Sequence, residues 1–147
     1  MNTIEVNYQN VINLDIDAAV IRFCNDVLKK IEIINWEISI LICDNSIIQD
    51  LNNKYRSIDL PTDVLSFNQD LVPVDGIVYA GDIVISLERV KDHSKSFNVP
   101  LDEELKRVLI HGILHLNGMD HLTNSKEEKM LQFQESILEE VSGARIV

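Results

Sequence analysis

Three histidines lie close together in the sequence, at positions 111, 115 and 121, and their spacing is typical of a metal site. His111 and His115 are four residues apart, so on a helix both imidazoles project from the same face. Gly118 follows, and glycine readily adopts the left-handed conformation that ends a helix, which would let the chain bring His121 back towards the first two. Three imidazoles on one divalent ion leave a fourth position open, as in catalytic rather than structural zinc sites.

We interpret these three histidines as ligands of one metal ion, because three unrelated histidines at this spacing would be unusual in a chain that holds only four. Zinc suits three imidazoles best, and nickel or copper would also accept these nitrogen ligands. Asp120 neighbours the third ligand and has two interpretations, as an acceptor for an imidazole N–H or as a turn residue. The fourth histidine, His93, lies among lysine and serine residues, and we expect it at the solvated surface.

The same histidine spacing occurs in the metzincin peptidases. Those enzymes need a glutamate directly after the first histidine, where it takes a proton from the zinc-bound water. This chain has Gly112 at that position. A peptidase of that mechanism would therefore lack its general base, which argues against proteolysis.

A second group of polar residues lies between Asn52 and Phe67. Arg56 stands at the end of a predicted helix, where its guanidinium could reach into a cleft and bind a phosphate bidentately. From spacing alone, an arginine that helps to close the helix end is the simpler interpretation. Thr62 and Asp63 likewise could simply cap or start the strand that follows them.

The composition indicates one domain over residues 1–147, since 46% hydrophobic and 25% charged residues are ordinary for a soluble globular protein. The net charge of −11 argues against a general affinity for nucleic acid, although a local basic cleft or a bound metal ion would change the local charge. The chain starts with neither a basic region nor a long apolar run, so we expect no secretory signal and no membrane span. Cys24 and Cys43 are expected to be buried free thiols in a reducing compartment, which favours the cytoplasm.

The hydrophobic pattern predicts an α+β fold, with about five helices packed on a small sheet of about four strands. The helices are expected at residues 15–31, 46–55 and 87–97, from near residue 102 to Gly118, and after a capping box at residues 125–128. The strands are expected at residues 36–43, 62–67 and 83–86, with a turn at Asp75-Gly76 between the last two.

Four of these elements carry more specific expectations. The strand at residues 36–43 has apolar residues on both sides, so it is expected to be covered on both faces. The helix that carries His111 is apolar around almost its full circumference, which predicts a central, buried helix. A second capping box, Ser46 to Gln49, is expected to open the second helix. The inner face of the last helix is expected to consist of Met130, Phe133, Ile137, Leu138 and Val141, with Gly143 at its end.

Three stretches of the sequence together resemble the YbeY family, the bacterial rRNA maturation endoribonucleases. These stretches are HGILHLNGMDH from His111, NNKYRSIDLPTDVLSF from Asn52 and GDIVIS from Gly81. The last helix, with Met130, Gln134, Glu135, Ile137 and Leu138, is also similar to that family's C-terminal helix. One departure is Met119, where the family usually has tyrosine, so any role of that hydroxyl is lost here.

The resemblance implies a zincin-like metal helix on a small mixed sheet and a zinc-like ion on His111, His115 and His121. It implies single-strand-specific RNA cleavage in the 3′-end maturation of small-subunit (16S) rRNA, and a role in ribosome quality control. The implied partners are single-stranded rRNA and the small ribosomal subunit with its proteins, without a membrane or a nucleotide cofactor. The resemblance also makes Arg56 a functional residue, which we expect to stabilise charge on the phosphate in the transition state.

Three points stay open from the sequence. The general base could be a metal hydroxide, the 2′-OH of the substrate or a nearby carboxylate. A non-catalytic ribosome-binding factor with a structural metal is an alternative function, which the open fourth coordination position argues against. A metallopeptidase is a further alternative, which Gly112 argues against.

Overall fold

The computed structural model describes residues 1–121, 128–141 and 143–147. Strands and helices alternate along most of the chain before three helices end it. Their bounds are β1 Thr3–Gln9, α1 Asp17–Lys30, β2 Trp36–Cys43, α2 Asn45–Arg56, β3 Val64–Asn68, β4 Val78–Ser86, α3 Leu87–Ser96, α4 Leu101–Leu116 and α5 Lys129–Val141.

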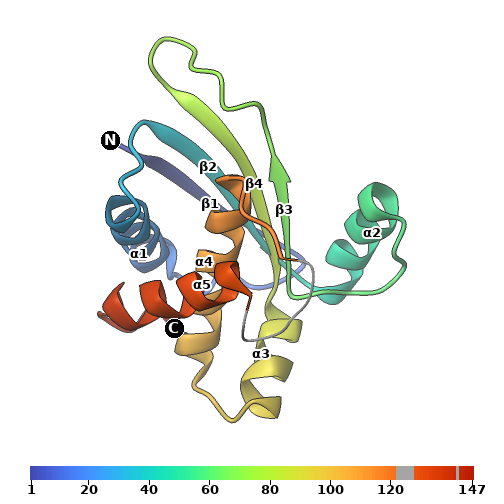
Figure 1. The fold of residues 1–147 in the computed structure, drawn as a ribbon. Helices are drawn as coiled ribbons and strands as arrows, with labels where there is room; N and C mark the ends of the chain where they lie inside the picture. Colours follow the sequence, from blue (N-terminus) through green and yellow to red (C-terminus); the bar gives the residue numbers. More distant parts are fainter. Residues whose placement is uncertain (122–127, 142) are drawn as a thin grey trace.

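The four strands form one mixed sheet in the order β1-β2-β4-β3. β1, β2 and β4 run parallel, whereas β3 pairs antiparallel with β4 and forms one edge. Helices α1 and α4 pack on one face of this sheet, α5 packs against these two helices, and α2 packs on the opposite face (Figure 1). The described residues therefore confirm the predicted α+β class, with five helices on a four-stranded mixed sheet.

Helix α4 lies at the centre of the molecule, as its apolar circumference predicts. It contacts β3 and β4 on one side and α1, α3 and α5 on others. Its acidic first turn lies at the positive end of the helix dipole. The predicted apolar stripe is buried throughout, at Leu105, Val108, Leu109, Gly112 and Leu116.

The predicted start of α2 is wrong by one residue and its predicted cap by two. Asp44, not Ser46, is the N-cap residue, and its Oδ1 accepts a hydrogen bond from the backbone N–H of Ile47 at 3.0 Å. Asp44 has extended backbone angles, which aim its short carboxylate at the free N–H groups of the first turn. At the other end, Ser57 adopts the left-handed conformation and stops the helix after Arg56.

Strand β2 is covered on both faces only near its C-terminal end, so the predicted full coverage is wrong. Cys43 is buried in a small apolar cluster beneath α2, together with Ile48 and Val84. Ser39 and Leu41 on the same side are only half-buried, although Leu41 packs against the edge of this cluster. Part of the second face of the sheet is therefore open.

The inner face of α5 also differs from the prediction at one position. Phe133 is 40% exposed, whereas the side chain of Gln134 is buried at 6% exposure. The stripe through Met130, Ile137 and Leu138 is buried as predicted. The proposed capping box at residues 125–128 lies largely outside the described residues.

Three further expectations can be compared with the structure. The turn at Asp75-Gly76 is confirmed, since both residues have positive φ values, of 51° and 79°, and a β-bridge joins Val74 to Ile77 around them. Cys24 and Cys43 are both free and buried, and burial raises the pKa of each thiol to about 12. Among the described helices, none combines the length and the apolar character that a membrane span requires.

Candidate metal centre

The three clustered histidines converge on one point at the C-terminal end of α4. His111 and His115 lie one turn apart on the helix, and their Nε2 atoms are 3.0 Å apart. The centroid of the His121 ring lies 5.1 Å from the centroid of the His111 ring and 5.5 Å from that of the His115 ring. One nitrogen from each of the three rings lies within 4.8 Å of the others, so the set could hold one divalent ion.

The turn after α4 brings His121 to this point. Gly118 has a φ of 84°, which glycine adopts at little cost. The N–H of Met119 donates to the carbonyl of Leu114, and the N–H of Gly118 donates to that of His115, each at 3.0 Å. This pair of bonds is a Schellman motif, which reverses the chain directly after a helix. The predicted role of Gly118 in ending the helix is confirmed.

Gln134, a residue of α5 to which sequence reasoning gave no role, holds the ring of His111. Its Oε1 lies 2.7 Å from Nδ1 of His111. Its Nε2 donates to the carboxylate of Glu135 at 3.2 Å, which fixes the amide with its oxygen towards the histidine. His111 therefore carries its proton on Nδ1 and directs the lone pair of Nε2 towards the other two rings.

Arg107 extends this chain of contacts by one residue. Its guanidinium donates to Glu135 at 3.0 Å and to Glu104 at 2.6 Å. Burial alone would raise the pKa of the Glu135 carboxyl, but hydrogen bonds from Arg107 and Gln134 outweigh it and hold that pKa below its usual range. Glu135 is thus an anion that accepts from Gln134, and the orientation of His111 depends on a row of charged and polar side chains on two helices.

The surroundings of His111 and His115 favour their neutral forms, which metal binding requires. Burial lowers the pKa of His111, and the hydrogen bond to Gln134 offsets part of this effect. Burial also lowers the pKa of His115, and the neighbouring His111 lowers it further. Both rings therefore favour the neutral form, in which a nitrogen lone pair is free to bind a cation.

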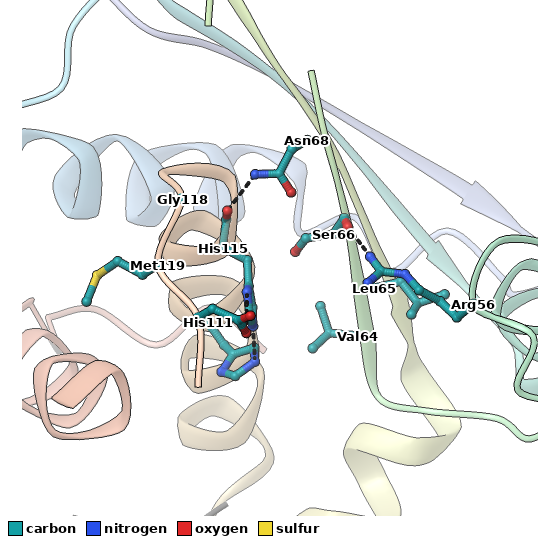
Figure 2. A pocket seen from close by; sticks show the side chains of 10 residues that line it. Arg56, Val64, Leu65, Ser66, Asn68, His111, His115, Gly118 and Met119 are labelled. Carbon is teal, nitrogen blue, oxygen red and sulfur yellow. Dashed lines mark hydrogen bonds and ion pairs between the residues drawn. The ribbon is translucent and has the colours of Figure 1, made fainter. Parts of the chain in front are cut away.

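A pocket of about 330 Å³ opens between α4 and the edge strand β3. Its lining includes His111 and His115 from α4, Val64 and Ser66 from β3, and Arg56 from α2. In Figure 2 the histidines and Arg56 approach from opposite sides, with Val64 and Ser66 between them. The structure therefore brings two of the three predicted metal ligands and the predicted phosphate-binding arginine to one cavity.

The side chain of Arg56 leaves its own helix. Its Nη2 donates to the backbone carbonyl of Ser66 on β3 at 2.8 Å, which fixes one end of the guanidinium (Figure 2). A guanidinium has five N–H donors, so this bond leaves others for an anion. Arg56 therefore does not simply close the end of α2.

Two polar residues of β3 attach this strand to α4, and sequence reasoning assigned neither of them a role. Nδ2 of Asn68 donates to the backbone carbonyl of His115 at 2.6 Å (Figure 2). Oγ of Ser66 donates to the carbonyl of Gly112 at 3.3 Å. These bonds satisfy carbonyls near the end of the helix and fix the two walls of the pocket relative to each other.

Gly112 has a packing reason to be glycine. A Cβ built at this position would lie 2.9 Å from Cγ2 of Ile83, a fully buried residue of β4. The glycine thus lets α4 lie directly on the sheet. Its Cα faces Ile83 rather than the three imidazoles, so a glutamate at this position would point into the core.

Asp120 behaves mainly as a turn residue. Its side chain is 80% exposed, and its Oδ1 accepts from the N–H of His121 at 2.8 Å. The distance from Oδ1 to Nδ1 of His115 is 4.0 Å, which is too long for a hydrogen bond. Of the two interpretations, the described geometry favours the turn.

The expectation for His93 is wrong, because its ring is half-buried rather than solvated. Nδ1 of His93 lies 3.4 Å from a carboxylate oxygen of Asp63, and Nε2 lies 3.4 Å from the guanidinium of Arg89. The arginine can only donate, so Nε2 of His93 accepts from it. The other oxygen of Asp63 accepts from the N–H of Val64 at 2.8 Å, so this residue also starts β3, as the simpler interpretation expects.

Asp63, His93 and Glu104 form a second group whose ligand atoms lie within 4.8 Å of one another. Arg107 already neutralises Glu104, whose carboxylate is buried at 3% side-chain exposure. Burial raises the pKa of Glu104, and the bond from Arg107 counteracts this. We therefore describe this group as an ion-pair network that joins α3, α4 and the start of β3.

Comparison with known proteins gives a consistent result across the chain. The family model described as Endoribonuclease YbeY matches residues 3–142. A protein of Treponema denticola with the name Endoribonuclease YbeY is 47% identical over 99% of this chain and 97% of its own length. A protein of Borreliella burgdorferi with the same name is 50% identical over 80% of this chain and 82% of its own. A solution structure of a Thermotoga maritima protein superposes with a TM-score of 0.67, at 30% identity, over 96% of this chain and 90% of that one.

Proposed function

Because this chain belongs to the YbeY endoribonuclease family, we propose that it hydrolyses single-stranded RNA at the 3′ end of small-subunit (16S) rRNA, and so contributes to ribosome quality control. Its partners would then be the rRNA, the small ribosomal subunit and the proteins of that subunit, and it would act in the cytoplasm. The observation that carries the proposal is that three imidazoles converge on one point, and that two of them, His111 and His115, line one cavity together with Arg56.

The donor set suits a single zinc ion on His111, His115 and His121. Nickel and copper also bind imidazole nitrogens and would suit the same ligands. When bound, such an ion supplies Lewis acidity, which stabilises negative charge on a phosphate group. Gln134 keeps the Nδ1 proton on His111 and thereby presents its Nε2 lone pair to the site.

Arg56 would act on the phosphate from the opposite wall. Its guanidinium is tethered to the carbonyl of Ser66, so its remaining donors are oriented before the substrate arrives. Donors that are already oriented stabilise developing charge without a cost of reorganisation. A fixed guanidinium also matches two phosphate oxygens better than an ammonium group does.

A peptidase is a poorer match to this site. The position that would supply the general base is Gly112, and Ile83 occupies the space next to it. The cavity instead offers an arginine, which is suited to an anionic substrate.

The test is the cleavage of a single-stranded fragment from the 3′ end of 16S rRNA by the zinc-loaded protein. A His115→Ala variant, purified in the same way, serves as the control for contaminating nucleases, and circular dichroism checks that it folds. The same fragment annealed to its complement serves as the double-stranded control. We expect the parent to cut only the single strand and the variant to cut neither.

Equal cleavage by parent and variant would place the activity in a contaminant or at another site. Absence of cleavage by the zinc-loaded parent, on both the free fragment and isolated small subunits, would overturn the proposal. Cleavage of small subunits alone would mean that the ribosome must present the substrate.

A further inference from the structure

A second cavity lies on the other side of β3, on the open part of the sheet that α2 leaves uncovered. It is a groove of about 840 Å³, and we call it the sheet groove. Its apolar lining is formed by Leu41, Val84 and Phe67 from the sheet and by Leu51 and Tyr55 from α2. The groove adjoins the histidine pocket, because Arg56, Ser66 and Asn68 line both cavities.

Two aromatic residues form one wall of the sheet groove. Tyr55 and Phe67 pack edge to face, with their ring centroids 5.2 Å apart and their planes at 65°. Phe67 packs on the small apolar cluster beneath α2, whereas Tyr55 belongs to neither core cluster and is 56% exposed. An aromatic ring that is held in place but remains open to solvent provides a surface on which another flat ring can stack.

The charged side chains near the groove differ in sign between its α2 side and its β4 side. Nζ of Lys54 lies 5.1 Å from the ring centre of Tyr55, and Cζ of Arg56 lies 5.7 Å from that of Phe67. These two cations stand at the aromatic end, in a chain with a net charge of −11. Asp82 lines the groove on β4 as the cross-strand partner of Phe67, and its carboxylate would repel a phosphate on that side.

The polar side chains of the groove suit the edge of a nucleobase. Gln69 offers an amide donor and acceptor, and Asp82 offers an acceptor for an exocyclic amine. A phosphate would thus be favoured beside Lys54 and Arg56 on the α2 side, and an uncharged ring would be favoured beside Asp82 on the β4 side. This distribution matches a nucleotide whose backbone lies on the α2 side.

We propose that the sheet groove is a nucleobase subsite, in which an unpaired base of the RNA strand stacks on Tyr55 beside Phe67 while a neighbouring phosphate contacts Arg56. The inference rests on the proposed function and gives a physical reason why the protein would select single-stranded over double-stranded RNA. A base must leave its helix to enter the groove, so a paired base cannot bind there without the cost of unpairing.

The test is a coupling experiment between the tyrosine and the base. The affinity of the zinc-loaded protein for a fluorescent single-stranded RNA decamer is measured by anisotropy. It is compared with a series of decamers that each carry one abasic nucleotide at a different position. The same series is measured with Tyr55→Ala, Tyr55→Phe and Phe97→Ala, the last a control at an aromatic residue that is 62% exposed on another surface.

We expect Tyr55→Ala to weaken binding of the intact decamer about tenfold, and one abasic position to weaken binding by the parent to the same extent. The two losses should not add, because the variant and the abasic RNA lack the same contact. Tyr55→Phe should retain parental affinity, since it keeps the ring, and Phe97→Ala should have no effect.

Additive losses, or an unchanged affinity in Tyr55→Ala, would overturn the subsite and leave the groove to another occupant, such as a protein. A parent that binds and cuts RNA without this coupling would contradict only the subsite. A parent that neither binds nor cuts RNA would contradict the proposed function itself.

Discussion

Oε1 of Gln134 on α5 lies 2.7 Å from Nδ1 of His111 on α4, so a residue 23 positions away in the sequence sets the orientation of the first candidate metal ligand. Gln134 is buried among apolar neighbours, and its amide is turned by Glu135, which Arg107 holds in place. A buried amide between a histidine and a carboxylate is satisfied on both sides, so it fixes one tautomer and one ring orientation.

Replacing Gln134 with alanine is therefore expected to weaken zinc binding about 10- to 100-fold, because His111 loses the partner that holds its ring and its Nδ1 proton. The measurement is a competition for zinc between the protein and a chelator of known affinity. Gln132→Ala, an exposed glutamine on the same helix, is the matched control. Equal affinities in the two variants would mean that Gln134 serves packing and not the metal.

Replacing Gly112 with alanine is expected to lower the free energy of unfolding by about 1 kcal/mol, and by no more than about 2 kcal/mol. Alanine favours a helix by about 1 kcal/mol over glycine, but the added methyl group would press on the buried side chain of Ile83, an overpacking that costs about 1–3 kcal/mol. Urea unfolding measures the difference. Gly143→Ala, at a position with no atom near the new Cβ, should change stability by less than about 0.5 kcal/mol.

A double variant makes this prediction specific to the contact. Gly112→Ala should cost less in an Ile83→Ala background, where the space for the methyl group already exists. A stabilised Gly112→Ala protein would show that α4 can move away from the sheet, and that Gly112 is not required by packing.

The sequence was sufficient to predict the features that depend on local spacing. The pairing of His111 with His115 follows from the period of a helix, and the reversal at Gly118 follows from the backbone freedom of glycine. The α+β class and the central position of α4 follow from the apolar pattern, which is a property of each segment by itself.

The features that sequence reasoning missed depend on contacts between segments. Gln134 is a polar residue on an otherwise apolar helix face, which is a signal of a buried partner, but the identity of that partner requires the packing of α5 on α4. His93 was misjudged because its neighbours in the sequence are hydrophilic, whereas its neighbours in space are Asp63 and Arg89. The N-cap of α2 was misplaced because Asp44 and Ser46 are both good capping residues, and only the backbone angles distinguish them.

The contact between Asp102 and the C-terminal segment leads to a pH prediction. Its Oδ1 accepts from the N–H of Ile146 at 2.6 Å, and its Oδ2 lies 3.0 Å from Nζ of Lys106. Burial acts to raise the pKa of Asp102, but these bonds outweigh it and hold the pKa below its usual value. A carboxylate whose pKa is lower in the folded state stabilises the fold above its unfolded pKa of about 3.9, and the contribution is lost as the pH falls through the folded pKa.

Asp102→Asn is accordingly expected to lower the free energy of unfolding by about 2 kcal/mol at pH 7. The difference from the parent should shrink as the pH falls below the unfolded pKa of about 3.9 and through the lower pKa of the folded state, where the parental carboxylate also becomes protonated. Urea unfolding of both proteins over this pH range tests whether their stability difference shrinks as the pH falls. Asp26→Asn, at an exposed position on α1, is the control, and a difference that stays constant with pH would exclude the charge of Asp102 as the cause.

Arg56→Ala is expected to lower the rate of RNA cleavage about 10²- to 10³-fold, the loss typical of removing one oriented donor from a charged transition state. Zinc affinity should stay at the parental value, because Arg56 contacts Ser66 and lies on the wall of the pocket opposite the histidines. Arg56→Lys should recover only part of the rate, since lysine keeps the charge but not the planar pair of donors. Arg22→Ala, at an exposed arginine of α1, controls for the loss of one positive charge from an acidic chain. Full activity in Arg56→Ala would remove this residue from the mechanism, and an equal loss in Arg22→Ala would attribute the effect to long-range attraction of RNA.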